Sequence, residues 1–292
     1  MAKISVVIPG YNGLPHIKNT IVSTLQQTEK DFELIYVDDK SSDQSLSMVY
    51  EYANRDKRIK VFENEENLGM AKNWNKAIQL ASGKYVKVLC SDDIIYSDCL
   101  EKQASILDQN KEISLVTSPS HVINAQGRIL LTRTPLSAKP TGKSKVFSFQ
   151  QVLKESIRLS RNLLGEPSIT LFRREDIERC GLFDDAYRYG TDLEYWFRLI
   201  SNKKLGVTGG VLAGYRLHPG SLTNTVMKKG EDELAKIFTA HSKTAEVLFD
   251  EARFRRNYQK QVHLKSTIMK IADIGIFCKI LNGLDSLRLM IA

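Results

Sequence analysis

The adjacent carboxylates Asp92 and Asp93 form the clearest candidate for a cation site in this sequence. They come shortly after the apolar run YVKVL at 85–89, where a buried strand would end. Two neighbouring carboxylates repel each other unless a cation or hydrogen bonds offset their charge. Mg²⁺ and Mn²⁺ accept oxygen ligands, typically one or two carboxylates together with substrate phosphates. The pair therefore predicts a divalent-metal site.

Asp38 and Asp39 form a second carboxylate pair, directly after the apolar run FELIYV at 32–37. The polar residues SSD at 41–43 offer caps for a following helix, so helix capping accounts for part of this group. One carboxylate of the pair would then remain to accept hydrogen bonds from a ligand.

Strands and helices alternate in the elements that must position these groups. Apolar, β-branched runs predict strands at 4–9, 32–37, 59–62, 85–89 and 114–118, and helical periodicity predicts helices at 16–27, 44–54, 70–81 and 97–109. This order predicts an α/β fold with a mostly parallel sheet covered by helices. Ligands of such sheets bind beyond the carboxyl ends of the strands, where the polar clusters 9–12, 38–39 and 91–93 fall. The alternative is that these residues only form turns.

The pattern continues less regularly beyond residue 120. We expect helices at 148–158, 174–180 and 191–202, a strand at 169–172 and one strand-like segment at 204–217. Between 113 and 154 there is no acidic residue, and 132–146 contains Pro135 and Pro140. We interpret 132–146 as a mobile basic loop that either closes over a phosphorylated substrate or is simply solvated surface.

Composition excludes several classes of protein. Of the residues in the chain, 42% are hydrophobic and 26% are charged, a composition typical of globular rather than disordered or fibrous proteins. The length of 292 residues fits two domains, or one domain with an appendage. The net charge of +8 favours anionic partners. The four cysteines lack CxxC spacing, which argues against a zinc ribbon or a disulfide framework and favours the cytosol. We see neither an export signal nor an apolar run long enough to span a membrane.

The stretch after residue 226 is helical in pattern and basic in charge. Between 253 and 279 the only acidic residue is Asp273, and the basic residues are Arg253, Arg255, Arg256, Lys260, Lys265, Lys270 and Lys279. An apolar stripe at helical spacing extends to Leu284. A basic amphipathic helix is typical of membrane-surface binding, so 253–284 would lie on a membrane. Packing on the body of the protein or on a partner subunit, as in a homo-oligomer, is the alternative.

Seven segments in order resemble family 2 glycosyltransferases: SVVIPGYN at 5–12, VDDKSSD at 37–43, ENLGMAKNWNKAI at 66–78, GKYVKVLCSDD at 83–93, PSITLFRREDIERCGLFDD at 167–185, GTDLEYWFRL at 190–199 and YRLHPGS at 215–221. The resemblance covers about residues 3–225. It implies a GT-A fold at 1–225 with a helical extension at 226–292. It also implies a nucleotide-sugar donor, usually of uracil or thymine, Mn²⁺ or Mg²⁺ as cofactor, and transfer with inversion.

The resemblance also assigns roles to residues. It implies nucleotide binding by Pro9, Tyr11, Asn12, Asp38, Asp39, Asn67, Lys72, Ser91 and Arg216, metal binding by Asp92, Asp93 and His218, and contacts with the donor or acceptor sugar by Glu166, Thr191 and Trp196. Asp192 would be the catalytic base. The sequence departs from the family pattern twice, because Cys90 occupies the first position of the D-x-D motif and Thr191 replaces a glutamate.

The acceptor implied by the resemblance is a saccharide or a lipid-linked saccharide in cell-surface polysaccharide synthesis, at a cytoplasmic site or on the inner face of the membrane. Two other classes stay open: a catalytically silent nucleotide-sugar-binding module and a nucleotidyltransferase. Nucleic-acid binding is disfavoured, since the positive charge lies in a loop and the C-terminal helices without a recognition motif.

Overall fold

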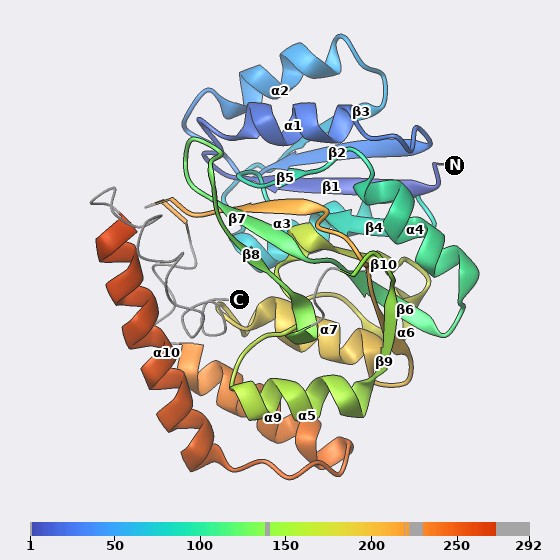
Figure 1. Ribbon diagram of the computed structural model, residues 1–292. Coiled ribbons are helices and arrows are strands. Elements are labelled where there is room, and N and C mark those ends of the chain that lie inside the picture. The colour runs from blue at the N-terminus through green and yellow to red at the C-terminus, as the bar shows by residue number, and fades with distance from the viewer. Residues whose placement is uncertain (1, 138–140, 219, 222–229, 273–292) are drawn as a thin grey trace.

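An eight-stranded sheet forms the centre of the computed structural model, which describes residues 2–137, 141–218, 220–221 and 230–272 (Figure 1). Its strand order is β3 (Ile59–Glu63), β2 (Phe32–Asp38), β1 (Ile4–Gly10), β4 (Tyr85–Val88), β10 (Thr170–Arg173), β6 (Ile113–Thr117), β11 (Lys204–Val207) and β9 (Lys145–Ser148). The first four strands of this order pair in parallel. The α/β class and the mostly parallel N-terminal sheet are therefore confirmed.

Strand β10 is antiparallel to both of its neighbours, β4 and β6. This reversal separates the N-terminal parallel strands from the parallel pair β6 and β11. Residue 170 consequently lies beside Thr117 near the carboxyl end of β6, and the segment leading into β10 approaches the edge of the sheet where ligands bind.

A smaller sheet has the order β5 (Ile94–Ile95), β12 (Ala213–Arg216), β7 (Ser120–Ile123) and β8 (Ile129–Arg133). The single strand expected at 204–217 is wrong, because the chain turns at 208–212 and β11 and β12 belong to different sheets. The loop expected at 132–146 is also shorter than predicted. Its ends pair with neighbouring strands, as the end of β8 and the start of β9.

Helices cover both faces of the main sheet. They are α1 (Ile17–Leu25), α2 (Ser45–Ala53), α3 (Met70–Gln79), α4 (Cys99–Gln109), α5 (Phe149–Leu159), α6 (Asp176–Cys180), α7 (Thr191–Ile200), α9 (Gly230–Thr244) and α10 (Glu251–Ala272), with short 3-10 turns η1 (Pro135–Ser137) and η2 (Pro167–Ile169). Alternate residues of a strand face opposite sides, so Ile4, Val6 and Ile8 pack with α1, α2 and α4, whereas Val7 packs with α3, α5 and α7.

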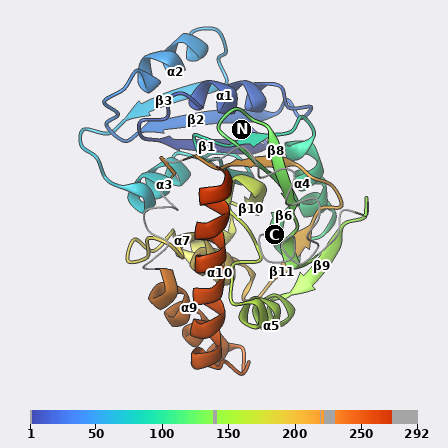
Figure 2. The same ribbon diagram turned by 60° about the vertical axis from the view of Figure 1, so that its left-hand side comes forward.

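The last two described helices pack against the body of the protein. Helix α10 runs along one side of the molecule beside α9 (Figures 1 and 2). Phe238, Phe254 and Tyr258 are buried in the same hydrophobic cluster as Val7 of the sheet. Arg255 forms ion pairs with acidic residues of α9 and α10.

Residues 273–284, the end of the expected basic amphipathic stretch, lie outside the described residues. Within the described part of the chain, no helix combines the length and apolarity needed to cross a bilayer. The division of the chain at residue 225 stays a prediction.

Candidate active site

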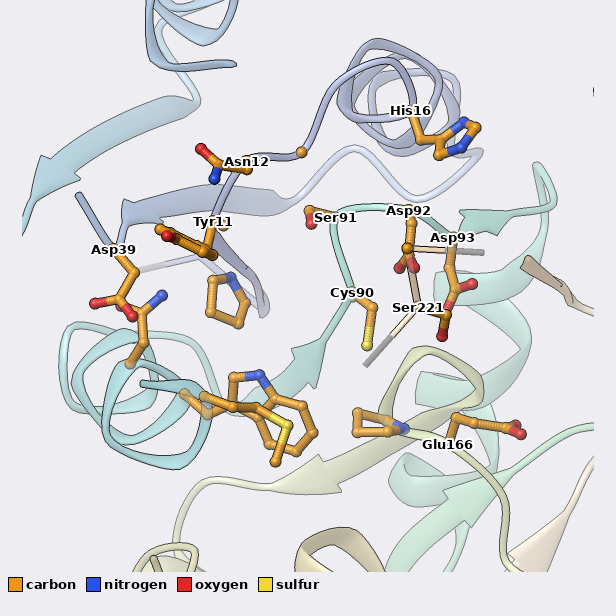
Figure 3. Close-up of a pocket in the computed structure, with 18 of the residues that line it drawn as sticks. Tyr11, Asn12, His16, Asp39, Cys90, Ser91, Asp92, Asp93, Glu166 and Ser221 are labelled. Atoms are coloured by element: carbon orange, nitrogen blue, oxygen red, sulfur yellow. The ribbon is translucent and has the colours of Figure 1, made fainter. Parts of the chain in front are cut away.

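A cavity of about 560 Å³ opens at the carboxyl ends of β1, β2 and β4. The expected site residues that line it are Pro9, Tyr11, Asn12, Asp39, Asn67, Ser91, Asp92, Asp93, Glu166, Thr191, Asp192 and His218. Tyr11 and Asp39 lie at one end, Asp92 and Asp93 at the other, and Glu166 on the facing wall (Figure 3). Residues far apart in the sequence thus meet in one cavity.

Asp39 is held firmly as a hydrogen-bond acceptor. Its Oδ1 accepts hydrogen bonds from the Asn64 side-chain amide at 2.7 Å and the Leu68 backbone N–H at 2.8 Å, and Oδ2 accepts one from the Gly69 N–H at 2.9 Å. The neighbouring Tyr11 ring is 54% exposed in the cavity. A fixed carboxylate beside an exposed ring is suited to a flat heterocycle that carries an N–H group.

Asp38, by contrast, serves the local fold. Its carboxylate accepts hydrogen bonds from the Tyr36 hydroxyl at 3.0 Å and from the backbone N–H and hydroxyl of Ser41 at 2.8 and 2.7 Å. The Asn12 side chain ties the end of β1 to the same turn, since its Oδ1 accepts the Ser42 N–H at 2.8 Å. Asp38 does not line the cavity, so the expected nucleotide contact is replaced by support of the turn.

Cys90, Asp92 and Asp93 gather at the end of β4. The Cys90 sulfur and one carboxylate oxygen from each aspartate lie within 4.8 Å of one another. Oδ2 of Asp92 also lies 2.9 Å from Nε2 of His218. Carboxylate oxygen, imidazole nitrogen and thiolate sulfur are all donors to divalent cations, so these residues fit a metal ion.

Asp93 is almost fully buried beneath this cluster. Its Oδ1 accepts the backbone N–H of Arg216 at 2.8 Å, and its Oδ2 accepts the Ser168 hydroxyl at 2.5 Å. The pKa of Asp93 is raised well above its usual value. The main cause is burial of the carboxyl group, and the second is repulsion by the charge of Asp92. Burial and the same two carboxylates raise the pKa of the Cys90 thiol. A bound cation would favour the ionised form of each group.

Arg216 does not reach the cavity. The side chain is 2% exposed, and its guanidinium donates hydrogen bonds to the backbone carbonyls of Asp92 at 2.7 Å and of Asn124 and Ala125 at 3.1 Å. These bonds hold the turn that carries Asp92. Arg216 thus has a structural role outside the residues that line the cavity, which does not support the expected phosphate contact.

Asp192 lies in the first turn of α7 and lines the cavity. Its Oδ1 accepts the Leu193 N–H at 2.7 Å, and its Oδ2 accepts the Asn162 side-chain amide at 3.2 Å. Burial raises the pKa of Asp192 to about 7. The hydrogen bond from Leu193 lowers this pKa, whereas the charge of Glu166 raises it further. A carboxylate with a pKa near 7 can exchange a proton with a substrate at neutral pH.

Glu166 faces Asp192 from the segment that precedes β10. One carboxylate oxygen pairs with Arg133, whereas Oε2 is buried without a hydrogen-bond partner in the described structure. Gly165, just before it, has φ +92°, and a Cβ there would lie 2.1 Å from the Ile169 side chain. Glycine is therefore required at this turn. Oε2 thus has an unused capacity to accept a hydrogen bond in the described structure.

Two more expected site residues lie away from the cavity. Lys72 is 62% exposed and 3.7 Å from Asp185, on the outer surface of α3. Trp196 is fully buried, and its indole N–H donates to the Gly165 carbonyl at 3.1 Å. The indole thus supports the Glu166 segment from behind, which replaces the expected sugar contact. Thr191, although it lines the cavity, donates its hydroxyl to the Tyr187 carbonyl at 2.7 Å.

Several residues that line the cavity were not among those expected from the sequence. On α3, Met70, Asn73 and Trp74 line the cavity. Their spacing of three and four places them on one helix face, a signal that was present in the sequence. His16 also lines it, 4.9 Å from the His218 ring, and no spacing in the sequence indicated that contact. Burial, together with Arg216 and His218, lowers the pKa of His16.

Comparison with known proteins decides the family. The family described as "Glycosyl transferase family 2" matches residues 5–181. The chain belongs to glycosyltransferase family 2. An uncharacterized glycosyltransferase of Methanocaldococcus jannaschii is 31% identical over 217 residues, which cover 73% of this chain and 70% of that protein. Two Rickettsia relatives are longer, and the matched region spans 34% of each.

Solved structures confirm the GT-A fold expected for this family 2 member. Residues 1–349 of Staphylococcus aureus TarS, in complex with UDP-GlcNAc, match with a TM-score of 0.66 at 20% identity, over 88% of this chain and 70% of that one. The Pyrobaculum calidifontis mannosyltransferase PcManGT, in complex with GDP-Man and Mn²⁺, matches with a TM-score of 0.60 at 18% identity, over 88% and 68%.

Proposed function

We propose that this family 2 glycosyltransferase moves a hexose from a nucleoside-diphosphate donor to an acceptor hydroxyl with inversion. The observation that carries the proposal is a single cavity lined by Asp39, by the Asp92–Asp93 cluster and by Asp192. These groups offer a base contact, a metal site and a proton acceptor.

The nucleotide would lie at the Asp39 end of the cavity. Asp39 accepts a hydrogen bond from a base N–H, Tyr11 covers the ring, and Pro9, Asn67 and Ser91 complete the walls. We expect uracil or thymine, so the donor is a UDP- or dTDP-sugar. The complexes of TarS with UDP-GlcNAc and of PcManGT with GDP-Man support a nucleotide-sugar donor.

Asp92, Asp93 and His218 would hold Mn²⁺ or Mg²⁺ at the opposite end. When bound, this cation supplies positive charge that stabilises the departing diphosphate. The complex of PcManGT with GDP-Man and Mn²⁺ supports a divalent metal as part of the proposal. Among the residues of this chain, Ser168 and Arg216 keep Asp93 and the Asp92 turn in place.

Asp192 is the proposed base. Its carboxylate takes the proton of the acceptor hydroxyl as that oxygen attacks the anomeric carbon from the face opposite the leaving group. The Asn162 amide orients the carboxylate, and the free Oε2 of Glu166 accepts a hydrogen bond from a sugar hydroxyl. The attack from the opposite face inverts the anomeric configuration.

The acceptor and the location are further parts of the proposal. We propose a saccharide or lipid-linked saccharide acceptor in cell-surface polysaccharide synthesis. The exposed basic residues Arg253, Arg256 and Lys260 on α10 support a site on the cytoplasmic face of a membrane. A homo-oligomer through the same helix is the alternative.

The test combines binding with turnover. Nucleotide sugars are screened for thermal stabilisation in Mn²⁺, and the hits are assayed for nucleoside-diphosphate release with wild type and Asp192→Asn. We expect the variant to bind the donor as wild type does and to turn over about 10²–10⁴-fold more slowly. Wild-type turnover by the variant would refute the base. Binding without release would indicate a silent module, and pyrophosphate release a nucleotidyltransferase.

A further inference from the structure

Cys90 places a sulfur atom within the acidic cluster of the cavity. Its Sγ and one carboxylate oxygen from each of Asp92 and Asp93 lie within 4.8 Å of one another. In a tetrahedral site with bonds of about 2.0–2.3 Å, neighbouring ligand atoms are roughly 3.3–3.8 Å apart. Small side-chain rotations therefore bring the three atoms around one ion.

An imidazole also contacts one carboxylate of this cluster. His218 Nε2 lies 2.9 Å from Asp92 Oδ2, and the His16 ring is 4.9 Å from the His218 ring. Both histidines line the same cavity as Cys90. The clustered donors are thus one sulfur and two carboxylates, and the His218 imidazole contacts the Asp92 carboxylate from outside this group.

The position of Cys90 is fixed by the same side chain that holds Asp93. The Cys90 backbone N–H donates to Ser168 Oγ at 3.0 Å, and that hydroxyl donates to Asp93 Oδ2 at 2.5 Å. Cys90 forms no disulfide with the other described cysteines, Cys99 and Cys180. The Ser168 hydroxyl therefore fixes the Cys90 backbone and the Asp93 carboxylate relative to each other.

Ligand chemistry then decides which ion fits. Mg²⁺ takes oxygen ligands and retains several waters, whereas Zn²⁺ binds thiolate, imidazole and carboxylate, commonly with four ligands. A D-x-D motif with aspartate at position 90 would present oxygen alone. Cysteine at this position shifts the preference of the site toward ions that accept sulfur.

We propose that Cys90 is a metal ligand and that this site selects Zn²⁺ over Mg²⁺. On binding, a sulfur–metal bond replaces the S–H bond and the proton passes to solvent. Zn²⁺ therefore competes with Mn²⁺ for the same position. The inference depends on the proposed function only for the placement of the cation at Asp92 and Asp93.

The test uses Cd²⁺ as a spectroscopic probe of thiolate coordination in the full-length chain. Titration of wild type with Cd²⁺ should produce an ultraviolet sulfur-to-metal charge-transfer band that saturates at one ion per chain. The band should disappear in Cys90→Ser and Cys90→Asp. It should persist in the matched control Cys180→Ser, because Cys180 lies on α6, outside the cavity lining.

Affinity provides the second measurement. Cys90→Asp, which restores the all-oxygen pattern, should bind Zn²⁺ at least about 10-fold more weakly than wild type and bind Mg²⁺ at least as well, measured by calorimetry. Equal Zn²⁺ affinity in the two proteins, or a Cd²⁺ band that survives in both Cys90 variants, would overturn the inference.

The outcomes separate this inference from the proposed function. Sugar transfer in Mn²⁺ without a Cd²⁺–thiolate band would leave the function standing and overturn the role of Cys90. A band in wild type that is lost in both Cys90 variants, without transfer from any donor, would support the thiolate ligand and refute the proposed function.

Discussion

At the scale of single residues, two opposing effects act on the pKa of Asp192. The first turn of a helix favours a negative charge, because the backbone N–H groups there carry partial positive charge. Burial in the cavity wall disfavours the same charge more strongly, and the pKa rises to about 7. The carboxylate is thus costly to ionise in the folded protein. A raised pKa of this kind supports the proposed role of Asp192 as a proton acceptor at neutral pH.

This cost predicts how stability depends on pH. The pKa of Asp192 is higher in the folded than in the unfolded chain, so the folded state binds the proton more tightly and loses stability as pH rises from about 4 to about 7. Asp192→Asn does not ionise. We expect the variant to melt several degrees above wild type at pH 8 and close to wild type at pH 4, measured by calorimetry.

The control for this prediction is Asp250→Asn, an exposed aspartate that caps α10 by accepting the Arg253 N–H at 2.9 Å. Its variant should show no comparable gain at pH 8. If Asp192→Asn were no more stable than wild type at pH 8, the carboxylate would be ionised without cost, and its burial could not tune it as a base.

At the scale of elements, α9 supports the loop that leads to the proposed base. Oε2 of Glu233, in the first turn of α9, accepts three backbone hydrogen bonds, from Arg188 at 2.9 Å, Tyr189 at 2.8 Å and Gly190 at 3.1 Å. Arg188 and Tyr189 line the cavity directly before α7. Helix α9 therefore holds a loop that lines the cavity, although the helix itself is not among the lining elements.

We expect Glu233→Ala to lower kcat/KM for transfer by about 10-fold or more, because the loop before Asp192 loses its fixed position. Nucleoside-diphosphate affinity should change little, since Asp39 and Asp92 follow strands β2 and β4 and are not part of this loop. Glu233→Gln retains one acceptor oxygen and should recover part of the activity. Steady-state kinetics and calorimetry measure the two effects.

The matched control is Asp232→Ala, which removes the neighbouring carboxylate and its surface ion pair with Arg255 at 2.7 Å. An exposed pair of this kind contributes little, so activity should stay near wild type. Equal losses in the Asp232 and Glu233 variants would show a general weakening of α9 rather than a specific support of the loop.

At the scale of the whole molecule, one hydrophobic cluster joins the sheet to the C-terminal helices. Phe238 of α9 and Phe254 of α10 are buried with α5 and α7 against the sheet. Their rings are in contact, with centroids 5.4 Å apart. Because one hydrophobic cluster contains residues of the sheet and of both helices, the body and the described C-terminal helices should unfold together.

Phe254→Ala tests this cooperativity. We expect a loss of about 3–5 kcal/mol in the free energy of unfolding, the usual cost of a cavity left by a buried phenylalanine. Denaturant unfolding followed by tryptophan fluorescence and by circular dichroism should give coincident transitions. Leu248→Ala, at a side chain that is 92% exposed, should change stability by less than about 0.5 kcal/mol. A fluorescence transition unmoved by Phe254→Ala would mean that α10 unfolds independently.

The sequence by itself determined the N-terminal α/β order, the family and the polar clusters at the strand ends. Those features follow from local periodicity and from short motifs, since a buried strand and the turn after it are encoded in consecutive residues. Asp39, Asp92 and Asp192 could be assigned to the cavity on that basis.

Only the tertiary structure decided which neighbours these residues have. Arg216 and Trp196 donate to backbone carbonyls of distant segments, whereas Asp38 is held by its near neighbours Tyr36 and Ser41. The split of 204–217 into two strands and the brace from Glu233 likewise depend on contacts between segments far apart in the chain. No local pattern encodes such contacts, since their partners are chosen by packing of the whole chain.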